Sequence, residues 1–408
     1  MTFIEFIRAH LTMGLVSKLI ETRRSTSSVI FDTVFTSRAS RAASRISLAQ
    51  IQRVTRSMPV ISRGGMAIPL DPAQAAVTMI EPLSIRLSDS LTGARLNDLR
   101  ALYGNGDENG QALVASELDK IVTDLMQTTE LTRNALCAQA ITGKIDYMMD
   151  SNGLKERYVI DYGTTQSYSP SVLLDAQEAT IVNLVQTLQA MQKQISDAGY
   201  AGTPVVLAGP NAFSTITNLI MVTDNAGRMG ATVQAGIVNI LGYEIHLVNG
   251  TYHDVDSSGK DVTKDEIDTN RICMLIRDHA ELDYCAIDDV QGNLQATPFF
   301  SKAVDIQDPS GVKLISESKP LPLVAPQAIC WATVTASMGS RSSTLVTNTV
   351  NVSSAEGKVY TETQLNALTK AKILEIASER GYEMTSNSES EKTTIVAEFI
   401  EKQTAVNS

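Results

Sequence analysis

Apolar residues at helical spacing open the chain and return in a longer run near residue 111. Phe3, Phe6, Ile7, Leu11, Leu15 and Leu19 predict an amphipathic helix, whose apolar face needs cover from its own core or from a neighbouring subunit. A second run predicts a helix over 111–142, which at 1.5 Å per residue is ~45 Å long, with Gly143 as its stop. A third helix is expected over 171–198.

Between the first two runs, residues 46–87 favour strand. Val77, Met79, Leu83, Ile85 and Leu87 keep a period of two, and Arg63-Gly64-Gly65 provides a turn where positive φ is accessible. Prolines at 59, 69, 72 and 82 cannot donate ladder hydrogen bonds, which favours an exposed two-stranded arm. A lone hairpin is marginal in water, so this arm needs another surface to lie on.

The remainder predicts an α+β fold. Residues 204–300 alternate short strands with a helix near 211–221, and 304–334 return to strand. Residues 335–357 are rich in Ser, Thr, Asn and Gly, typical of a linker. Two tail helices, 369–380 and 391–403, resemble a helix-extended-loop-helix module. The charge from Tyr360 to Ser408 is −3, eight Glu against five Lys and Arg, which favours protein docking or display, or a solvated appendage, over DNA binding.

Charge is spread unevenly along the 408 residues. Residues 1–63 hold ten Lys and Arg against three Asp and Glu, a net charge of +7. Because the whole chain has a net charge of −11, residues 64–408 carry −18. This basic arm, with Arg38, Arg41 and Arg45 near helical intervals, suits an acidic neighbouring subunit, packaged nucleic acid or plain solvent. A neighbour is favoured over nucleic acid, because Ser and Ala rather than aromatics separate the basic residues.

Candidate chemistry is sparse. The four histidines stand in no recognised catalytic motif, so no enzyme and no cofactor is predicted. The four cysteines form no CxxC pair and are expected to be buried hydrophobes. No apolar run approaches 18 residues, so no membrane span is expected.

Acidic clusters offer one weak metal candidate. Asp254, Asp256, Ser258 and Asp265 occupy positions 1, 3, 5 and 12 of a calcium-loop template, but position 12 is Asp rather than Glu. A solvated hairpin turn is favoured. The cluster of Asp283, Asp288 and Asp289 is likewise expected to be a solvated acidic edge.

Residues 1–334 resemble the major capsid protein of lambda-type tailed bacteriophages. The resemblance rests on Ser62-Arg63-Gly64-Gly65, the stretch 79–87, the long helix ending near 143–147, and the segments 308–310 and 323–326. It implies the Hong Kong 97 capsid fold, in which hexamers and pentamers tile an icosahedral head around the genome.

Mapped onto that fold, the chain has an N-terminal arm (1–45), an extended loop (46–87), and a peripheral domain (88–203 and 301–334) with spine helix 111–142. An axial domain (204–300), a linker (335–358) and a C-terminal module (359–408) follow. The resemblance implies portal, scaffold and decoration partners, double-stranded DNA on the inner face, and a virion capsid assembled in the host cytoplasm. Expected inter-subunit contacts are Phe3, Phe6, Arg38, Arg41, Arg45, Arg63, Gly64, Gly65, Met79 and Ile85.

One departure bears on stability. Some members of this fold join subunits by an isopeptide bond from a lysine of the extended loop, and here no lysine occurs between Lys18 and Lys120. No such cross-link is predicted. Open alternatives are an encapsulin-like compartment that stores enzymes, a soluble enzyme, and a nucleic-acid-binding protein acting through the basic arm.

Overall fold

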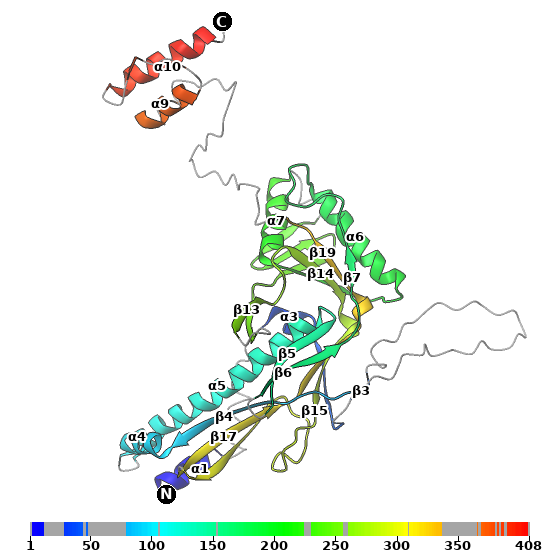
Figure 1. Ribbon diagram of the computed structural model, residues 1–408, viewed down its shortest axis with the longest axis vertical. Helices are drawn as coiled ribbons and strands as arrows, with labels where there is room; N and C mark the ends of the chain where they lie inside the picture. Colours follow the sequence, from blue (N-terminus) through cyan, green and yellow to red (C-terminus); the bar gives the residue numbers. More distant parts are fainter. Residues whose placement is uncertain are drawn as a thin grey trace, which may run out of the picture. The chain divides into compact units, whose positions relative to one another are not determined.

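The computed structural model contains two compact units, Met1–Ser342 and Ser343–Ser408. It describes residues 2–11, 28–43, 46–47, 79–104, 107–151, 154–223, 230–255, 260–308, 310–336, 365, 369–379, 382, 385–386 and 390–406. Helices and several mostly antiparallel or mixed sheets occur in separate runs along the first unit, which confirms the α+β class (Figure 1). Among the helices so described, none combines the length and the apolar character that crossing a bilayer requires.

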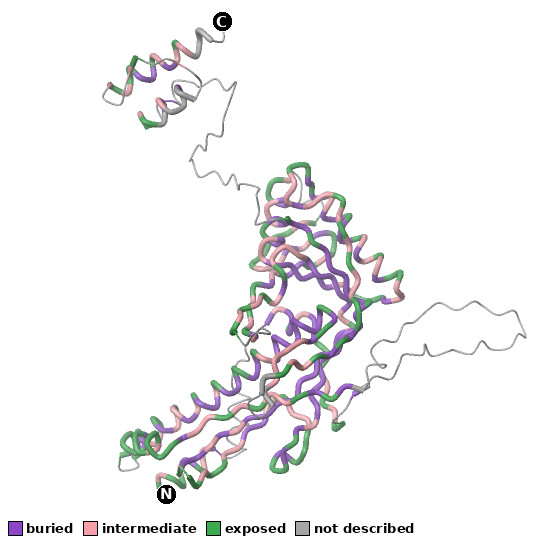
Figure 2. Tube along the Cα trace, in the orientation of Figure 1, coloured by how far each residue is buried: buried purple, intermediate pink, exposed green. Residues whose placement is uncertain are grey.

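A long helix on a narrow sheet forms one end of the larger unit. α5 (Glu108–Ala140) has 33 residues, close to the prediction, and begins where Asp107 accepts a hydrogen bond from Gly110 N. It lies along the antiparallel sheet β16-β17-β4 (Phe300–Gln307, Ser310–Ser318 and Ile85–Thr92) (Figure 1). α1 (Phe3–His10) and α4 (Gly93–Tyr103) pack on the same end. Buried positions alternate with more exposed ones along α5 as far as Thr132, as a helix covering one face requires, and every residue from Arg133 to Ala140 is buried (Figure 2).

At its other end, α5 turns at Gly143, which has φ +90°. A Cβ there would lie 2.5 Å from the carbonyl oxygen of Gly163, so only glycine fits. The hairpin β5 (Lys144–Ser151) and β6 (Leu154–Asp161) follows. Nearby, β15 (Ala280–Cys285) pairs with β1 (Ser37–Arg41) in parallel and with β18 (Pro320–Val324) antiparallel, and α3 (Val29–Thr33) precedes β1.

A seven-stranded mixed sheet organises the rest of the first unit. Its strand order is β7-β19-β14-β8-β11-β10-β9. Helices α6 (Ile181–Asp197) and α7 (Pro210–Val222) pack with it in one hydrophobic core. The strands span Gln166–Tyr168, Ile329–Thr333, Arg271–Ile276, Pro204–Ala208, Tyr243–Leu247, Ile237–Ile240 and Thr232–Gln234.

Strand pairing does not follow the boundaries drawn from sequence at 203/204 and 300/301. β7 and β19, placed in the peripheral segments, join the sheet of the expected axial unit, whereas β15, placed in the axial unit, pairs with β1 and β18. Sequence boundaries miss these pairings because β19 pairs with β14 and β7, which are more than 50 residues away, and no local pattern specifies such a partner. Assignment to peripheral and axial roles stays a prediction.

The arm also differs in detail. The two-stranded arm predicted over 46–87 has a period of two through 77–87. In the structure, β3 (Met79–Ile80) pairs with β2 (Ile46–Ser47), and β4 starts only at Ile85 in another sheet. Pro82, which lacks an N–H, falls in the break. Between β2 and β3, the loop from 48 to 78 lies outside the described residues, as do Arg63, Gly64 and Gly65.

Shorter elements complete the first unit. β12 (Thr251–Val255) and β13 (Asp261–Asp265) form a hairpin, and 3-10 turns occupy Arg277–His279 and Pro326–Ala328. The helix expected over 171–198 begins at Ile181, because Thr180 and Asn183 form a capping box there.

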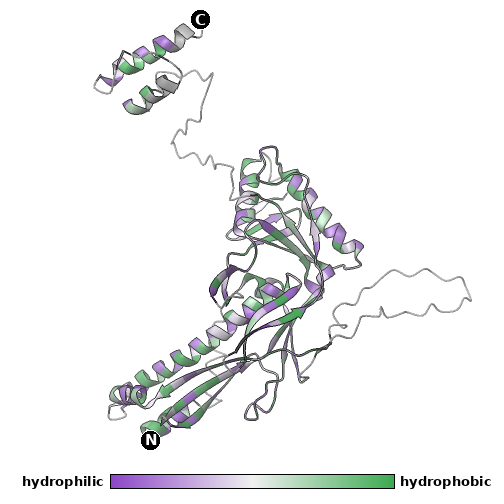
Figure 3. Cartoon of the chain, in the orientation of Figure 1, coloured by the Kyte–Doolittle hydropathy of each residue, from purple (hydrophilic) through white to green (hydrophobic). Residues whose placement is uncertain are grey.

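The second unit is a small helix pair, α9 (Lys370–Glu379) and α10 (Lys392–Val406). Ile373, Ala377, Ile395 and Phe399 form its core, and hydrophobic and hydrophilic residues alternate along α10 (Figure 3). Glu398 of α10 accepts hydrogen bonds from the backbone and hydroxyls of Thr385 and Ser386, and these hold the pKa of its carboxyl down at about 2.

Candidate functional site

The sequence predicts contact surfaces rather than a catalytic pocket, so the first question is where the expected contact residues lie. Phe3 and Phe6 pack on Tyr103 of α4, with ring centroids 5.4 and 5.5 Å apart. Ile7 of the same helix is fully buried, and His10 Nε2 lies 2.8 Å from Asp119 Oδ1 on α5. The apolar face of α1 is therefore covered by its own chain over the described residues, which is one of the two alternatives that the pattern left open.

Arg38 is held by α3. Its Nε and Nη2 donate to the carbonyl oxygens of Phe35 and Phe31, at 3.0 and 3.3 Å, close to the end of α3. Its guanidinium carbon lies 3.8 Å from the centroid of the Phe31 ring, and that of Arg133 on α5 lies 3.6 Å from it. Two cations stacked on one ring fix the α3–β1 segment against α5.

Arg41 of β1 forms ion pairs with two carboxylates of the neighbouring strand β15. It donates to the fully buried Asp283 and, at 3.3 Å, to Glu281. Burial raises the pKa of the Asp283 carboxyl to about 6, and Glu281 adds to the rise, whereas Arg41 opposes it. The carboxylate is therefore held next to a cation and yet is less easily ionised than an exposed one.

The prediction of a solvated acidic edge at Asp283, Asp288 and Asp289 is wrong. Asp283 and Asp289 are buried, and Asp289 pairs with Lys302. Asp288, although exposed, pairs with the buried Lys319. Pairing occurs because Arg41 of β1, Lys302 of β16 and Lys319, which follows β17, lie beside these carboxylates in the fold, which spacing along the sequence does not reveal.

The two strand residues of the expected contact set lie apart. Met79 pairs with Ser47 in the short β2–β3 ladder, whereas Ile85 pairs with Ser318 and belongs to the sheet beneath α5. Tyr158 of β6 donates its hydroxyl to the carbonyl of Glu81 at 2.8 Å and so anchors the connection between β3 and β4. Arg45 lies outside the described residues.

Of the ten basic residues that precede Gly64, the structure describes Arg8, Arg38 and Arg41. Arg8 Nη2 lies 2.7 Å from Asp305 Oδ2 and Arg38 Nη2 lies 3.9 Å from Asp32 Oδ1, while Arg41 makes the pair already described. Each thus has a carboxylate of its own chain beside it, so none of the three supports nucleic-acid binding by the arm.

The weak calcium candidate does not converge. Asp254 is buried and accepts from Lys264 at 2.6 Å and Arg157 at 3.3 Å. Burial acts to raise the pKa of Asp254, but Lys264 and Arg157 lower it overall. Asp265 pairs with Thr251 and Asp254 with Val262, so the backbone positions of the two aspartates are three residue pairs, about 10 Å, apart along the hairpin. Asp256 and Ser258 lie outside the described residues, and within the described ones no group of three metal-ligating side chains assembles.

Exposed apolar side chains are the contact candidates that sequence reasoning missed. Val290 is 83% exposed and Leu294 57% exposed on the loop between β15 and β16, and Leu294 has a positive φ of 52°. Met221 and Val222 at the end of α7 are also largely exposed. Residues of this kind are common at subunit contacts, but no periodicity distinguishes them from buried ones before the fold is known.

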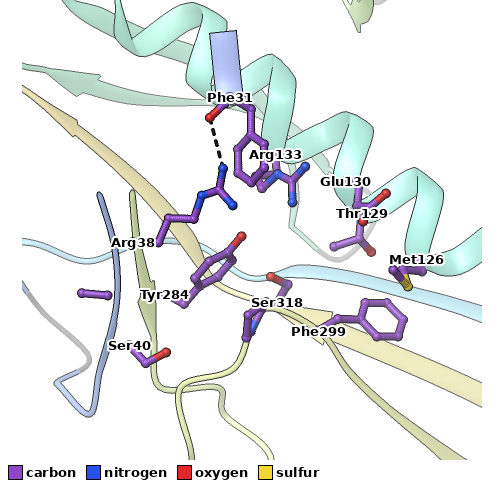
Figure 4. A pocket seen from close by; sticks show the side chains of 12 residues that line it. Phe31, Arg38, Ser40, Met126, Thr129, Glu130, Arg133, Tyr284, Phe299 and Ser318 are labelled. Atoms are coloured by element: carbon purple, nitrogen blue, oxygen red, sulfur yellow. Dashed lines mark hydrogen bonds between the residues drawn. The ribbon is translucent and has the colours of Figure 1, made fainter. Parts of the chain in front are cut away.

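A cavity of about 440 Å³ opens where α3, β1 and α5 meet. Figure 4 shows Arg38, Arg133 and Tyr284 on one side of it, and Phe299 and Met126 on the other. Glu130, Thr129 and Ser318 complete its polar lining, and all three are buried.

The described cysteines are all free and buried, as predicted. Burial raises the pKa of the thiols of Cys137 and Cys330 to about 12 and that of Cys285 to about 11. None of these thiols is a nucleophile at neutral pH.

A family model, phage major capsid protein E, matches residues 16–334. None of the curated proteins matches the chain. The putative capsid protein of a prophage of E. coli CFT073 is similar in structure, with 15% sequence identity and a TM-score of 0.54 over 79% of this chain and 98% of that one. Such a score at this identity shows a shared fold.

Two further structures are similar at lower scores. A virus-like particle from Pyrococcus furiosus has 10% identity and a TM-score of 0.38 over 81% of this chain and all of that one. A mature capsid chain of bacteriophage PhiM1 has 12% identity and a TM-score of 0.43 over 78% and 90%. At these scores neither adds to the argument.

Proposed function

Because the chain belongs to the phage major capsid protein E family, it is a structural protein of the virion capsid that assembles with copies of itself, and we propose that its assembled units are pentamers and hexamers of an icosahedral head. It has the Hong Kong 97 capsid fold. In this proposal the protein acts through contacts rather than catalysis, the head encloses double-stranded DNA, and assembly takes place in the host cytoplasm with portal and scaffold proteins.

One observation supports the proposal most: the 33-residue helix α5 lies on the three-stranded sheet β16-β17-β4, beside a separate seven-stranded sheet. In this proposal, α5 with its sheet forms the peripheral part and the seven-stranded sheet the axial part. The rod gives a subunit two distant ends, so that each copy can contact several neighbours at once, as a closed shell requires.

The remaining expected contacts belong to the same proposal. Arg45, Arg63, Gly64 and Gly65 are proposed contact residues of the arm and loop. Phe3, Phe6, Arg38, Arg41, Met79 and Ile85 contact their own chain, so any role between subunits would be shared with these internal contacts. A decoration protein on the outer surface is a further proposed partner.

Expression of the full chain, followed by native mass spectrometry and electron microscopy, tests the proposal. We expect five- and six-fold multiples of the 44.0 kDa chain, and closed shells or hexameric sheets. A single 44.0 kDa species at high concentration, with and without a co-expressed scaffold, contradicts it. Nuclease-protected DNA in particles from infected cells supports a viral head, whereas particles that hold only protein cargo favour the encapsulin-like alternative.

A further inference from the structure

We propose that the cavity at the junction of α3, β1 and α5 receives an acidic side chain from a second copy of this chain. The inference rests on the self-assembly of the protein and assigns one of its contacts. The cavity has about 440 Å³, enough for an acidic side chain together with part of the backbone that carries it.

Contacts within the chain hold the two arginines that line the cavity in place before anything binds there. Arg38 donates its Nε and Nη2 to the carbonyls of Phe35 and Phe31, which holds its guanidinium plane in place while the side chain stays 41% exposed. Arg133 donates Nε and Nη2 to Asn134 Oδ1, at 3.2 and 2.9 Å, and stacks on the same ring. Arginines held by packing lose little side-chain entropy when they bind a carboxylate, and their planar fork matches its geometry.

The lining as a whole favours a carboxylate on an apolar stem. The lining contains two arginines, Arg38 and Arg133, and one carboxylate, Glu130. Asp32 lies 3.9 Å from Arg38. Hydroxyls of Ser40, Tyr284 and Ser318 add polar groups, and the side chains of Met126 and Phe299 provide apolar contact at the opposite wall (Figure 4). Pro298 also lines the cavity.

Charge identifies the occupant as another copy. Residues 64–408 carry −18, so acidic side chains outnumber basic ones on this part of every neighbouring copy. A hollow lined by two arginines is a place where an approaching acidic side chain is attracted. Local complementarity of this kind favours assembly of a chain with a net charge of −11, because it offsets part of the repulsion between copies.

Ser40 at the cavity allows a direct test of occupancy. The four native cysteines are buried, so in Ser40→Cys only the introduced thiol reacts readily in the folded chain. We expect a fluorescein-maleimide adduct to lower the yield of shells at least tenfold, and a methylthio adduct at the same position to leave it near that of the unmodified variant. The introduced thiol should also react at least tenfold more slowly in assembled shells than in dissociated subunits.

Two near-isosteric variants test the charge of the occupant. Ser40→Asp places a carboxylate beside the arginines and should lower shell yield at least tenfold in 0.15 M salt, with partial recovery in 0.5 M salt because screening weakens the repulsion. Ser40→Asn should assemble like the wild type. Equal yields for Asp and Asn overturn an acidic occupant, and assembly of the maleimide adduct at the wild-type level overturns any occupant. The wild type, assembled in parallel, separates both outcomes from failure of the proposed function.

Discussion

Replacing Ile7 with alanine tests whether the N-terminal helix is stabilised by its own chain. Ile7 is fully buried between α4, α5 and the sheet, and the substitution removes three carbons from that contact. Large-to-small changes of this kind cost about 2–5 kcal/mol. An isolated helix as short as the eight residues of α1 does not persist in water, so the loss should appear as detachment of α1 rather than as unfolding of the whole unit.

Ile4 in the same helix is the matched control, because 39% of it is exposed. Ile4→Ala changes helix propensity by the same amount as Ile7→Ala, so the difference between the two variants isolates burial. We expect Ile4→Ala to change the free energy of detachment by less than about 0.5 kcal/mol, as most exposed substitutions do.

Amide hydrogen exchange of the α1 peptide measures this difference by mass spectrometry. The N–H of Phe6 and that of Leu11 are bonded to Thr2 O and Ile7 O, at 2.9 and 3.0 Å, and are protected only while α1 is formed. Since each 1.4 kcal/mol is a factor of ten, exchange in Ile7→Ala should accelerate about 30-fold to several thousand-fold. Equal acceleration in the two variants would refute the packing argument, and so would an unchanged rate in both.

Three further predictions follow from the charged groups. The pKa of Asp283 is raised from 3.8 to about 6 in the folded chain, so between about pH 4 and 6 this group ionises in the unfolded chain before it ionises in the folded one. The free energy of unfolding in urea should therefore fall as pH rises from about 4 to 6, and Asp283→Asn should flatten that pH dependence. An unchanged slope in the variant contradicts this. Arg157→Met should cost about 2–4 kcal/mol in urea unfolding because it leaves the buried Asp254 with less compensation, whereas Lys193→Met, which breaks an exposed pair, should cost under about 0.5 kcal/mol. Mature particles should run as monomers in SDS electrophoresis, because residues 19–119 contain no lysine; a covalent ladder contradicts this.

Local patterns predicted the elements whose signal lies within one segment. The run after residue 111 and the stop at Gly143 were sufficient for α5, because a 3.6-residue apolar period over 33 residues has few alternative explanations. Helix α7 was predicted near 211–221 and spans Pro210–Val222. The split of 79–87 into β3 and β4 was missed, because a period of two does not say which partner each half pairs with.

The contact residues were harder to predict. Arg38 and Arg41 were selected for their charge, but their partners Phe31 and Asp283 became apparent only in the fold. Arg133 was not selected at all, since one arginine in the middle of a helix resembles any solvated residue until α3 packs against it.

By itself, the sequence determined the class of fold, the long helix, the buried cysteines and the family that the chain resembles, because each is encoded in short-range periodicity, composition or local sequence motifs. Only the tertiary structure decided that the acidic cluster is neutralised, that α1 is covered, and that two arginines line a cavity. Each outcome brings together side chains that are separated along the chain, by 242 residues for Arg41 and Asp283 and by 109 for His10 and Asp119, and the pairing of strands and helices, not their local pattern, brings such groups into contact.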